Sequence, residues 1–133
     1  WSFFIFYDSL AKREDIKMKK LLVIFCIFIT QLDANEKSIN QQWCSANGGV
    51  SEYRTNYGTY VDCLTEEYAV EVEFDYNWKE SIGQSLHYAE ATNKKPAVLV
   101  IKRTKSKKDY LGEFNQTIDR FNLPITVFVV DEK

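Results

Sequence analysis

The clearest pattern in the chain is a strict alternation of apolar and polar positions in the segment YAVEVEF, residues 68–74. The apolar positions recur at every second residue, as on one face of a strand, and they are Tyr68, Val70, Val72 and Phe74. The opposite face would carry Glu71 and Glu73. Two shorter segments, 50–55 and 59–65, precede this one and are separated by a short turn. The pattern predicts an antiparallel meander of three strands.

Helical periodicity flanks the meander. Apolar residues at helical spacing predict one helix over 36–47, ended by the glycines that follow it, and a second helix over 77–91. In the second helix, Asn77 and Glu80 have the spacing of a capping box. The order of elements so far is αβββα.

The C-terminal part of the chain adds a strand over 97–102, a helix over 107–121 and a last strand over 125–130. The run at 97–102 is almost entirely apolar, as expected of a strand that is covered on both faces. The full order, αβββαβαβ, predicts a single-domain α/β protein.

The N-terminal segment has the composition of a targeting sequence. Met18, the only methionine, is followed by two lysines, an apolar run over 21–30 and then Ala34. This succession is typical of a secretory signal peptide over 18–34, and the run is shorter than the roughly 20 residues that a membrane span needs. A membrane-anchored N-terminus and a buried helix are the alternatives. Residues 1–17 are interpreted as upstream read-through without a structural role.

Removal of the signal peptide would leave residues 35–133 as one exported domain, periplasmic or secreted. This part holds 12 basic and 15 acidic residues, a formal net charge of −3. That balance differs from the strongly basic one of many nucleic-acid binders, so local patches would carry such a role. Cys44 and Cys63 remain as an even number in an exported chain, which permits a disulfide; two buried thiols are the alternative.

Acidic residues of the meander have the chemistry of a metal site. Asp62 lies on the second strand, and Glu71 and Glu73 lie on the third. Because a tight turn joins the two strands, Asp62 and Glu71 are expected to converge. Buried glutamates are costly unless a cation neutralises them, and carboxylates are ligands that Mg²⁺ prefers. The alternative is that this face of the sheet is solvated.

The following helix favours the site over the solvated face. Gln84 and Tyr88 are four residues apart, so they share one side of the helix. His87, the only histidine, lies nearby and is more often packed or on the surface than catalytic. Glu52 and Arg54, on the first strand, either pair with each other or line the site.

The ordered set Asp62, Glu71-Val72-Glu73 and Gln84-x-x-x-Tyr88 resembles the PD-(D/E)xK nuclease superfamily, and Gln-x-x-x-Tyr resembles its RecB-like branch. The superfamily has an αβββαβ restriction-endonuclease-like core, to which this chain would add a C-terminal helix and strand. The stretches DCLT, VEVEF and SIGQSL also resemble small exported bacterial proteins of uncharacterised activity.

The resemblance implies a catalytic set, which is Asp62, Glu71, Glu73, Gln84 and Tyr88. Asp62 and Glu71 would bind Mg²⁺ or Mn²⁺. Glu73 stands where the superfamily usually has a lysine that activates the attacking water; some of its members carry Glu there. Lys79, on the helix, ranks below Glu73 as a replacement because it lies about 140° from Gln84 around the helix axis.

Basic residues cluster on both sides of the predicted strand at 97–102. Lys102, Arg103 and Lys105 are expected to contact phosphates of a nucleic acid, most simply DNA, without reading its sequence. A solvated loop is the alternative. The chain is therefore interpreted as an exported Mg²⁺- or Mn²⁺-dependent deoxyribonuclease. The rival hypothesis is an inactive exported binding module that keeps the nuclease-like fold.

Overall fold

The computed structural model describes residues 2–132, with side chains over 14–27 and 35–132. The chain divides into two compact units, Trp1–Asn35 and Glu36–Lys133. Helix α1 spans Ser2–Ala46, and its side chains over 14–27 are all exposed. Within the described part of the chain, no helix combines the length and apolar character needed to cross a membrane. The predicted cleavage point after Ala34 lies outside the residues whose side chains are described, so the signal peptide over 18–34 stays a prediction.

The second unit is built on one five-stranded sheet with the order β1-β2-β3-β4-β5. The strands are β1 Val50–Arg54, β2 Tyr60–Leu64, β3 Tyr68–Phe74, β4 Lys95–Lys102 and β5 Thr126–Asp131. The first three are antiparallel neighbours, whereas β3, β4 and β5 run parallel. The predicted meander and the predicted α/β class are confirmed, including the helix and strand added after the αβββαβ order.

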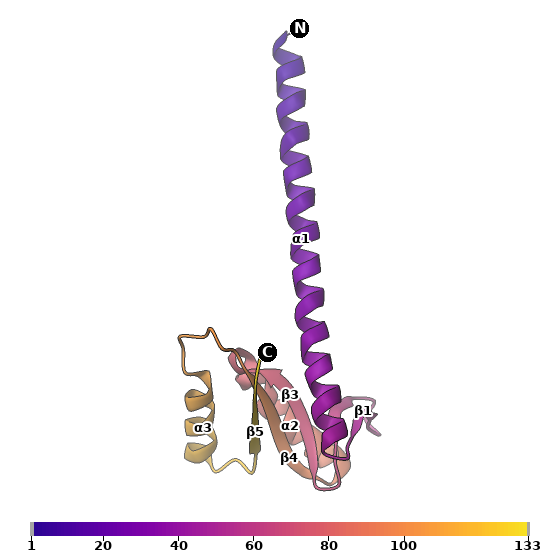
Figure 1. Ribbon diagram of the computed structural model, residues 1–133, viewed down its shortest axis with the longest axis vertical. Helices are drawn as coiled ribbons and strands as arrows, with labels where there is room; N and C mark the ends of the chain where they lie inside the picture. The colour runs from indigo at the N-terminus through magenta and orange to yellow at the C-terminus, as the bar shows by residue number, and fades with distance from the viewer. Residues whose placement is uncertain (1, 133) are drawn as a thin grey trace. The chain divides into compact units, whose positions relative to one another are not determined.

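Helices cover both faces of this sheet (Figure 1). The C-terminal end of α1 packs on one face through Cys44, with Ile39 and Trp43 beside it. Helices α2 (Trp78–Thr92) and α3 (Tyr110–Phe121) cover the other face, where Trp78 and Phe114 lie against Val98 and Val100 of β4. The strand β4 is therefore buried on both sides, as its apolar run predicts.

A disulfide fastens α1 to the sheet. Cys44 of α1 and Cys63 of β2 are bonded, with a Cα–Cα distance of 5.6 Å. Gly49 lies directly against the bridge, since a Cβ at this position would come within 2.5 Å of Cys63 Sγ and 2.7 Å of Cys44 Sγ. Glycine at this position thus lets the chain turn from α1 into β1 beside the two sulfur atoms.

The helix starts differ from their predicted form. Asn77 is the N-cap residue of α2, but its side chain makes no capping hydrogen bond, so the predicted capping box with Glu80 is wrong. The Asn77 amide instead donates to Glu73, 3.1 Å away. Helix α3 starts at Tyr110 rather than 107, because the Asp109 side chain accepts a hydrogen bond from Gly112 N and caps the helix there.

Candidate functional site

The structure brings Asp62 and Glu71 together where the pairing of β2 with β3 ends. The ladder pairs Leu64 with Ala69 and Cys63 with Val70, so Asp62 and Glu71 occupy the next position in register. There the Asp62 carboxylate takes the place of a main-chain acceptor on the neighbouring strand, because its Oδ2 accepts a hydrogen bond from Val72 N at 2.8 Å. The expected convergence of the two acids therefore follows from the register of the hairpin.

Glu71 is buried, with 4% of its surface exposed, although it carries a carboxyl group. Burial raises the pKa of Glu71 to about 10, and the neighbouring Asp62 charge and a hydrogen bond to Asp62 act in the same direction. Burial also raises the pKa of Asp62, while its hydrogen bonds to Val72 N and to Glu71 oppose that rise. Without a cation, the pair thus holds a proton on Glu71 that is shared with Asp62.

Tyr88 of α2 closes the site from the helix side. It is buried with Val61 and Ala69, and a hydrogen bond to Glu71 helps to raise its pKa after the larger effect of burial. Despite this contact, Glu71 Oε2 is buried and has no hydrogen-bond partner among the described residues. A buried carboxyl oxygen that lacks a donor is an unsatisfied acceptor, and such groups call for a partner.

The carboxyl pair fits a divalent cation in the chemistry of its donors. Asp62 and Glu71 supply adjacent carboxylate oxygens, and Glu71 Oε2 is the atom left without a partner. Magnesium commonly takes one or two protein carboxylates and keeps several waters. Among the described residues, no group of three or more His, Cys, Asp or Glu side chains is arranged to hold a metal. Any metal here would therefore rest on these two carboxylates.

Glu73 lies on the same strand face but has its own local partners. Its Oε1 accepts hydrogen bonds from Phe74 N at 2.9 Å and from the Asn77 amide at 3.1 Å. Burial raises the pKa of Glu73, and these two hydrogen bonds lower it. Glu73, which stands where the resemblance places a catalytic lysine, thus links the end of β3 to the turn Asp75–Asn77. This turn leads into α2.

The other candidate residues of α2 have surroundings different from that of the carboxyl pair. Gln84 is exposed and lies one helical turn before Tyr88, and no hydrogen bond of its side chain is found in the described part of the chain. Lys79 is exposed and lies over the Trp78 ring, with 5.7 Å from Nζ to the centroid. His87 is packed, with 3.1 Å between its Nε2 and Thr59 Oγ1.

Three further residues act on the site, and of these the sequence suggests only Glu52, as a residue that either pairs with Arg54 or lines the site. Asn40 of α1 is 3% exposed, and its amide donates to the Asp62 main-chain oxygen at 2.9 Å. The sequence signal for this contact is a polar residue that lies between Ile39 and Trp43, on the side of the helix that faces the sheet. The charge of Glu36 raises the pKa of Glu71, and that of Glu52 raises the pKa of Asp62. Glu52 also has a left-handed backbone, with φ of 55°.

The predicted phosphate-contacting residues lie at the carboxyl end of β4. Lys102 and Lys105 are exposed. Arg103 is held by Asp75, whose Oδ1 accepts from Arg103 Nε at 3.0 Å. These residues are thus near the end of β3 as well, since Phe74 and Ile101 are partners in the sheet.

Comparisons with known proteins give short, partial matches. The chain is 35% identical over 74 residues to one KilA-N domain-containing protein of Acanthamoeba polyphaga mimivirus, covering 56% of this chain and 20% of that protein. It is 43% identical over 54 residues to another from the same virus, covering 41% of this chain and 15% of that protein. The chain thus spans a fifth or less of the length of these relatives. No protein-family model and no solved structure matches it.

Proposed function

We propose that the protein is a nuclease that hydrolyses phosphodiester bonds of DNA with the help of Mg²⁺ or Mn²⁺. The observation that carries this proposal is the buried pair Asp62–Glu71, in which one carboxyl oxygen has no partner. Two carboxyl groups in one buried place repel each other when ionised, and a divalent cation would relieve both the repulsion and the unsatisfied oxygen.

In this proposal each residue of the site has a distinct task. Asp62 and Glu71 would hold the metal, which activates water and offsets charge on the phosphate. Tyr88 would orient Glu71 through its hydroxyl, and Asn40 would fix the Asp62 backbone. Gln84, exposed on the same side of α2 as Tyr88, is placed to contact substrate rather than the carboxyl pair.

DNA is the proposed substrate on two grounds. A DNA-binding role is the one that the KilA-N domain-containing relatives favour. Independently, the exposed Lys102 and Lys105 and the oriented Arg103 offer positive charge at one end of a sheet whose domain is acidic overall. Contacts of this kind neutralise phosphates without reading sequence.

The proposal is tested by assaying the purified protein on plasmid and single-stranded DNA with Mg²⁺, Mn²⁺ or EDTA. Asp62→Asn and Glu71→Gln keep the shape of the site and remove its charge, so each is expected to lower cleavage at least about 100-fold. Glu66→Gln is the matched control, because Glu66 is exposed and remote from the pair in the hairpin turn. Metal-dependent cleavage that is equal in all four proteins would exclude the assignment.

A second candidate is a nucleic-acid-binding module that does not cleave. The observation in its favour is Glu73, whose Oε1 is engaged by Phe74 N and the Asn77 amide, as in a structural role. Glu73→Gln separates the two candidates, because a glutamine oxygen still accepts both hydrogen bonds but cannot act as a base. A general-base role predicts loss of cleavage at unchanged melting temperature. Unchanged cleavage shows that Glu73 is structural, and no cleavage in the wild type favours the binding module.

Export is part of the proposal. It rests on the succession of lysines, apolar run and Ala34 after Met18. Expression with the native N-terminus in a bacterial host, followed by mass measurement of the periplasmic protein, tests it. A mass that corresponds to a chain starting at Asn35 is expected, and an unprocessed chain in the cytoplasm would contradict export.

A further inference from the structure

A pocket lies at the carboxyl end of β4, apart from the carboxyl pair. It has a volume of about 350 Å³, and its lining residues are Arg103, Thr104, Lys105, Ser106 and Glu132. This size is at the lower end of the range for small-molecule sites, which suits a ligand of roughly one nucleotide. The lining combines two cations, two hydroxyls and one carboxylate, so its chemistry is that of a site for a polar anion.

Arg103 is oriented in this pocket by a buried partner. The Asp75 side chain is 4% exposed and that of Arg103 is 35% exposed, with 3.0 Å between Nε and Oδ1. Asp75 Oδ2 also accepts from Arg103 N at 3.4 Å. Asp75 thus engages Nε, and no hydrogen bond of either Nη nitrogen is found in the described part of the chain. A guanidinium held in this way keeps two donors in a fixed plane, the geometry that binds phosphate oxygens.

Two aromatic rings restrict the same guanidinium. Its Cζ lies 4.2 Å from the Tyr76 centroid and 5.9 Å from that of Tyr110. Tyr76 in turn stacks on Phe74, and Lys108 Nζ lies 4.8 Å from the Tyr110 centroid. Contacts of this type are attractive and hold the side chain in place, so Arg103 loses little further freedom when it binds a ligand.

We propose that this pocket binds the terminal phosphate of a nucleic-acid strand. A terminal phosphomonoester presents three free oxygen acceptors, one more than an internal phosphodiester, so it can take the Nη donors of Arg103, the Lys105 ammonium and a hydroxyl of the lining together. Glu132, on the same lining, would repel a second phosphate. The strand therefore ends in the pocket rather than passing through it, and Glu132 is left to accept a hydrogen bond from the terminal sugar or base.

The inference takes its substrate class from the proposed nuclease function. It adds the place at which the end of the nucleic-acid strand is bound. Val98 is the partner of Glu71 in the sheet, and Arg103 follows five residues later. At roughly 3.3 Å per residue, Arg103 lies about 16 Å further along the strand direction than the carboxyl pair. This corresponds to roughly five phosphates of a B-form strand, so the pocket would hold an end while a bond a few nucleotides away reaches the acids.

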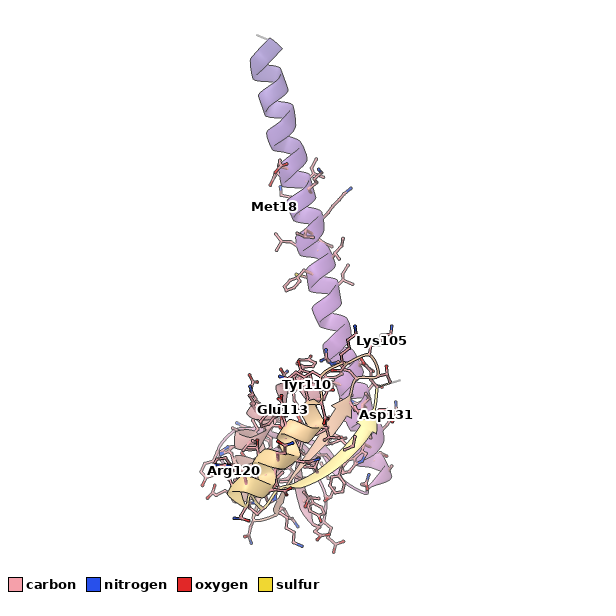
Figure 2. All side chains as sticks on the ribbon, turned by 90° about the vertical axis from the view of Figure 1, so that its left-hand side faces the viewer. Met18, Lys105, Tyr110, Glu113, Arg120 and Asp131 are labelled. Atoms are coloured by element: carbon pink, nitrogen blue, oxygen red, sulfur yellow. A yellow bond between two sulfur atoms is a disulfide. The ribbon has the colours of Figure 1, made fainter. Side chains whose placement is uncertain are left out.

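Binding of short single-stranded oligonucleotides with 5′-phosphate, 3′-phosphate or only hydroxyl ends tests the proposal, measured by fluorescence anisotropy in EDTA. Lys105→Ala removes an exposed charge, and Arg103→Lys keeps a cation beside Asp75 but loses the planar fork. Arg120→Ala is the matched control, because Arg120 is exposed and lies at the opposite end of α3 from Tyr110 and Lys105 (Figure 2).

The expected result is that one phosphorylated end binds about tenfold more tightly than the hydroxyl end. Lys105→Ala and Arg103→Lys are expected to lower that preference at least about threefold, and Arg120→Ala to preserve it. Equal affinity for all ends in the wild type, equal loss in the control, or equally good competition by inorganic phosphate would overturn the proposal. Because EDTA prevents metal-dependent cleavage, end preference can hold or fail independently of nuclease activity.

Discussion

The two faces of β3 differ in what they bury. Val70, Val72 and Phe74 belong to the apolar core on the α1 side, together with the Cys44–Cys63 disulfide. The alternating residues Glu71 and Glu73 belong to the other face, where Glu71 is as deeply buried as the valines. One face is thus stabilised by burial of apolar surface, whereas the other buries a carboxyl group that opposes folding when ionised.

This difference separates a face that stabilises the fold from the face to which we assign the proposed function. A buried carboxyl pair is no better for stability than well-packed apolar side chains, which is why the proposed function gives it a cation. The face of β3 that packs against α1 carries only apolar side chains and buries no carboxyl group. Substitutions on alternate residues of one strand should therefore have opposite consequences.

The largest effect is expected from Val72→Glu. Val72 is 2% exposed and lies among apolar side chains, so the new carboxylate would have no partner and would cost about 4 kcal/mol or more. That is a large part of the stability of a small domain. Thermal unfolding followed by circular dichroism is expected to show a lost or strongly lowered transition. The neighbour Glu71→Gln is the control and should unfold at or above the wild-type temperature. Equal midpoints for the two variants would remove the distinction between the faces.

Removal of the disulfide should weaken the apolar face more than the carboxyl face, which α1 contacts through Asn40. Cys44→Ser with Cys63→Ser is expected to cost about 3 kcal/mol, from the greater freedom of the unfolded chain. Urea unfolding of the unprocessed full chain measures this loss, and Cys26→Ser, at an exposed free cysteine of that chain, should change nothing. Metal-dependent cleavage at low temperature should persist in the double variant. If cleavage is lost while the protein remains folded, the two faces are coupled more tightly than the packing indicates.

The carboxyl face should make stability depend on pH in an unusual direction. The pKa of Glu71 is raised to about 10 in the folded protein, so the folded state keeps a proton that the unfolded state releases above its ordinary pKa near 4.5. The contribution of Glu71 to stability in EDTA is therefore fully present below that value and is lost as pH rises toward 10. Between pH 5 and pH 7 the fall should be on the order of 1–3 kcal/mol.

Urea unfolding of wild type and Glu71→Gln across this pH range measures the effect. The difference between the two proteins isolates Glu71 from the other acids. Added Mg²⁺ should reduce the slope in the wild type only, because a bound cation favours the ionised pair. Parallel pH curves for the two proteins would show that Glu71 is not held protonated.

The fold was predictable because each element carries a local signal. The alternation in residues 68–74 and the apolar run in β4 identify strands, and the short turns between the first three strands leave little choice but a meander. The start of α2 was not predictable in the same way. Asn77 and Glu80 have capping-box spacing, but Glu73, four residues before Asn77, takes the Asn77 amide. Two local partners thus compete at the start of α2, and the contact between Asn77 and Glu73 forms in place of the capping box.

The carboxyl site was only partly predictable for a similar reason. Hairpin register brings Asp62 beside Glu71, and register can be read from the turn. Whether a residue on the helix reaches the site depends on how the helix is rotated against the sheet, which buries Tyr88 and leaves Gln84 exposed. The contribution of Asn40 depends on α1 docking on Asp62 from far away in sequence. The sequence marks Asn40 as a polar residue on the inward side of a helix, but no local pattern specifies its partner.

The smallest effect is expected from the contact between Tyr88 of α2 and Glu71 of the sheet. Tyr88→Phe removes the hydrogen bond to Glu71 while keeping the buried ring, so it should cost about 1 kcal/mol in urea unfolding. The exposed Tyr57, whose hydroxyl reaches Glu90 only at 3.4 Å, provides the control: Tyr57→Phe should stay within about 0.5 kcal/mol of wild type. A loss confined to Tyr88→Phe would show that a contact from α2 partly offsets the burial of Glu71. Equal, negligible losses would leave Glu71 buried without support from α2, and the case for a bound cation would become stronger.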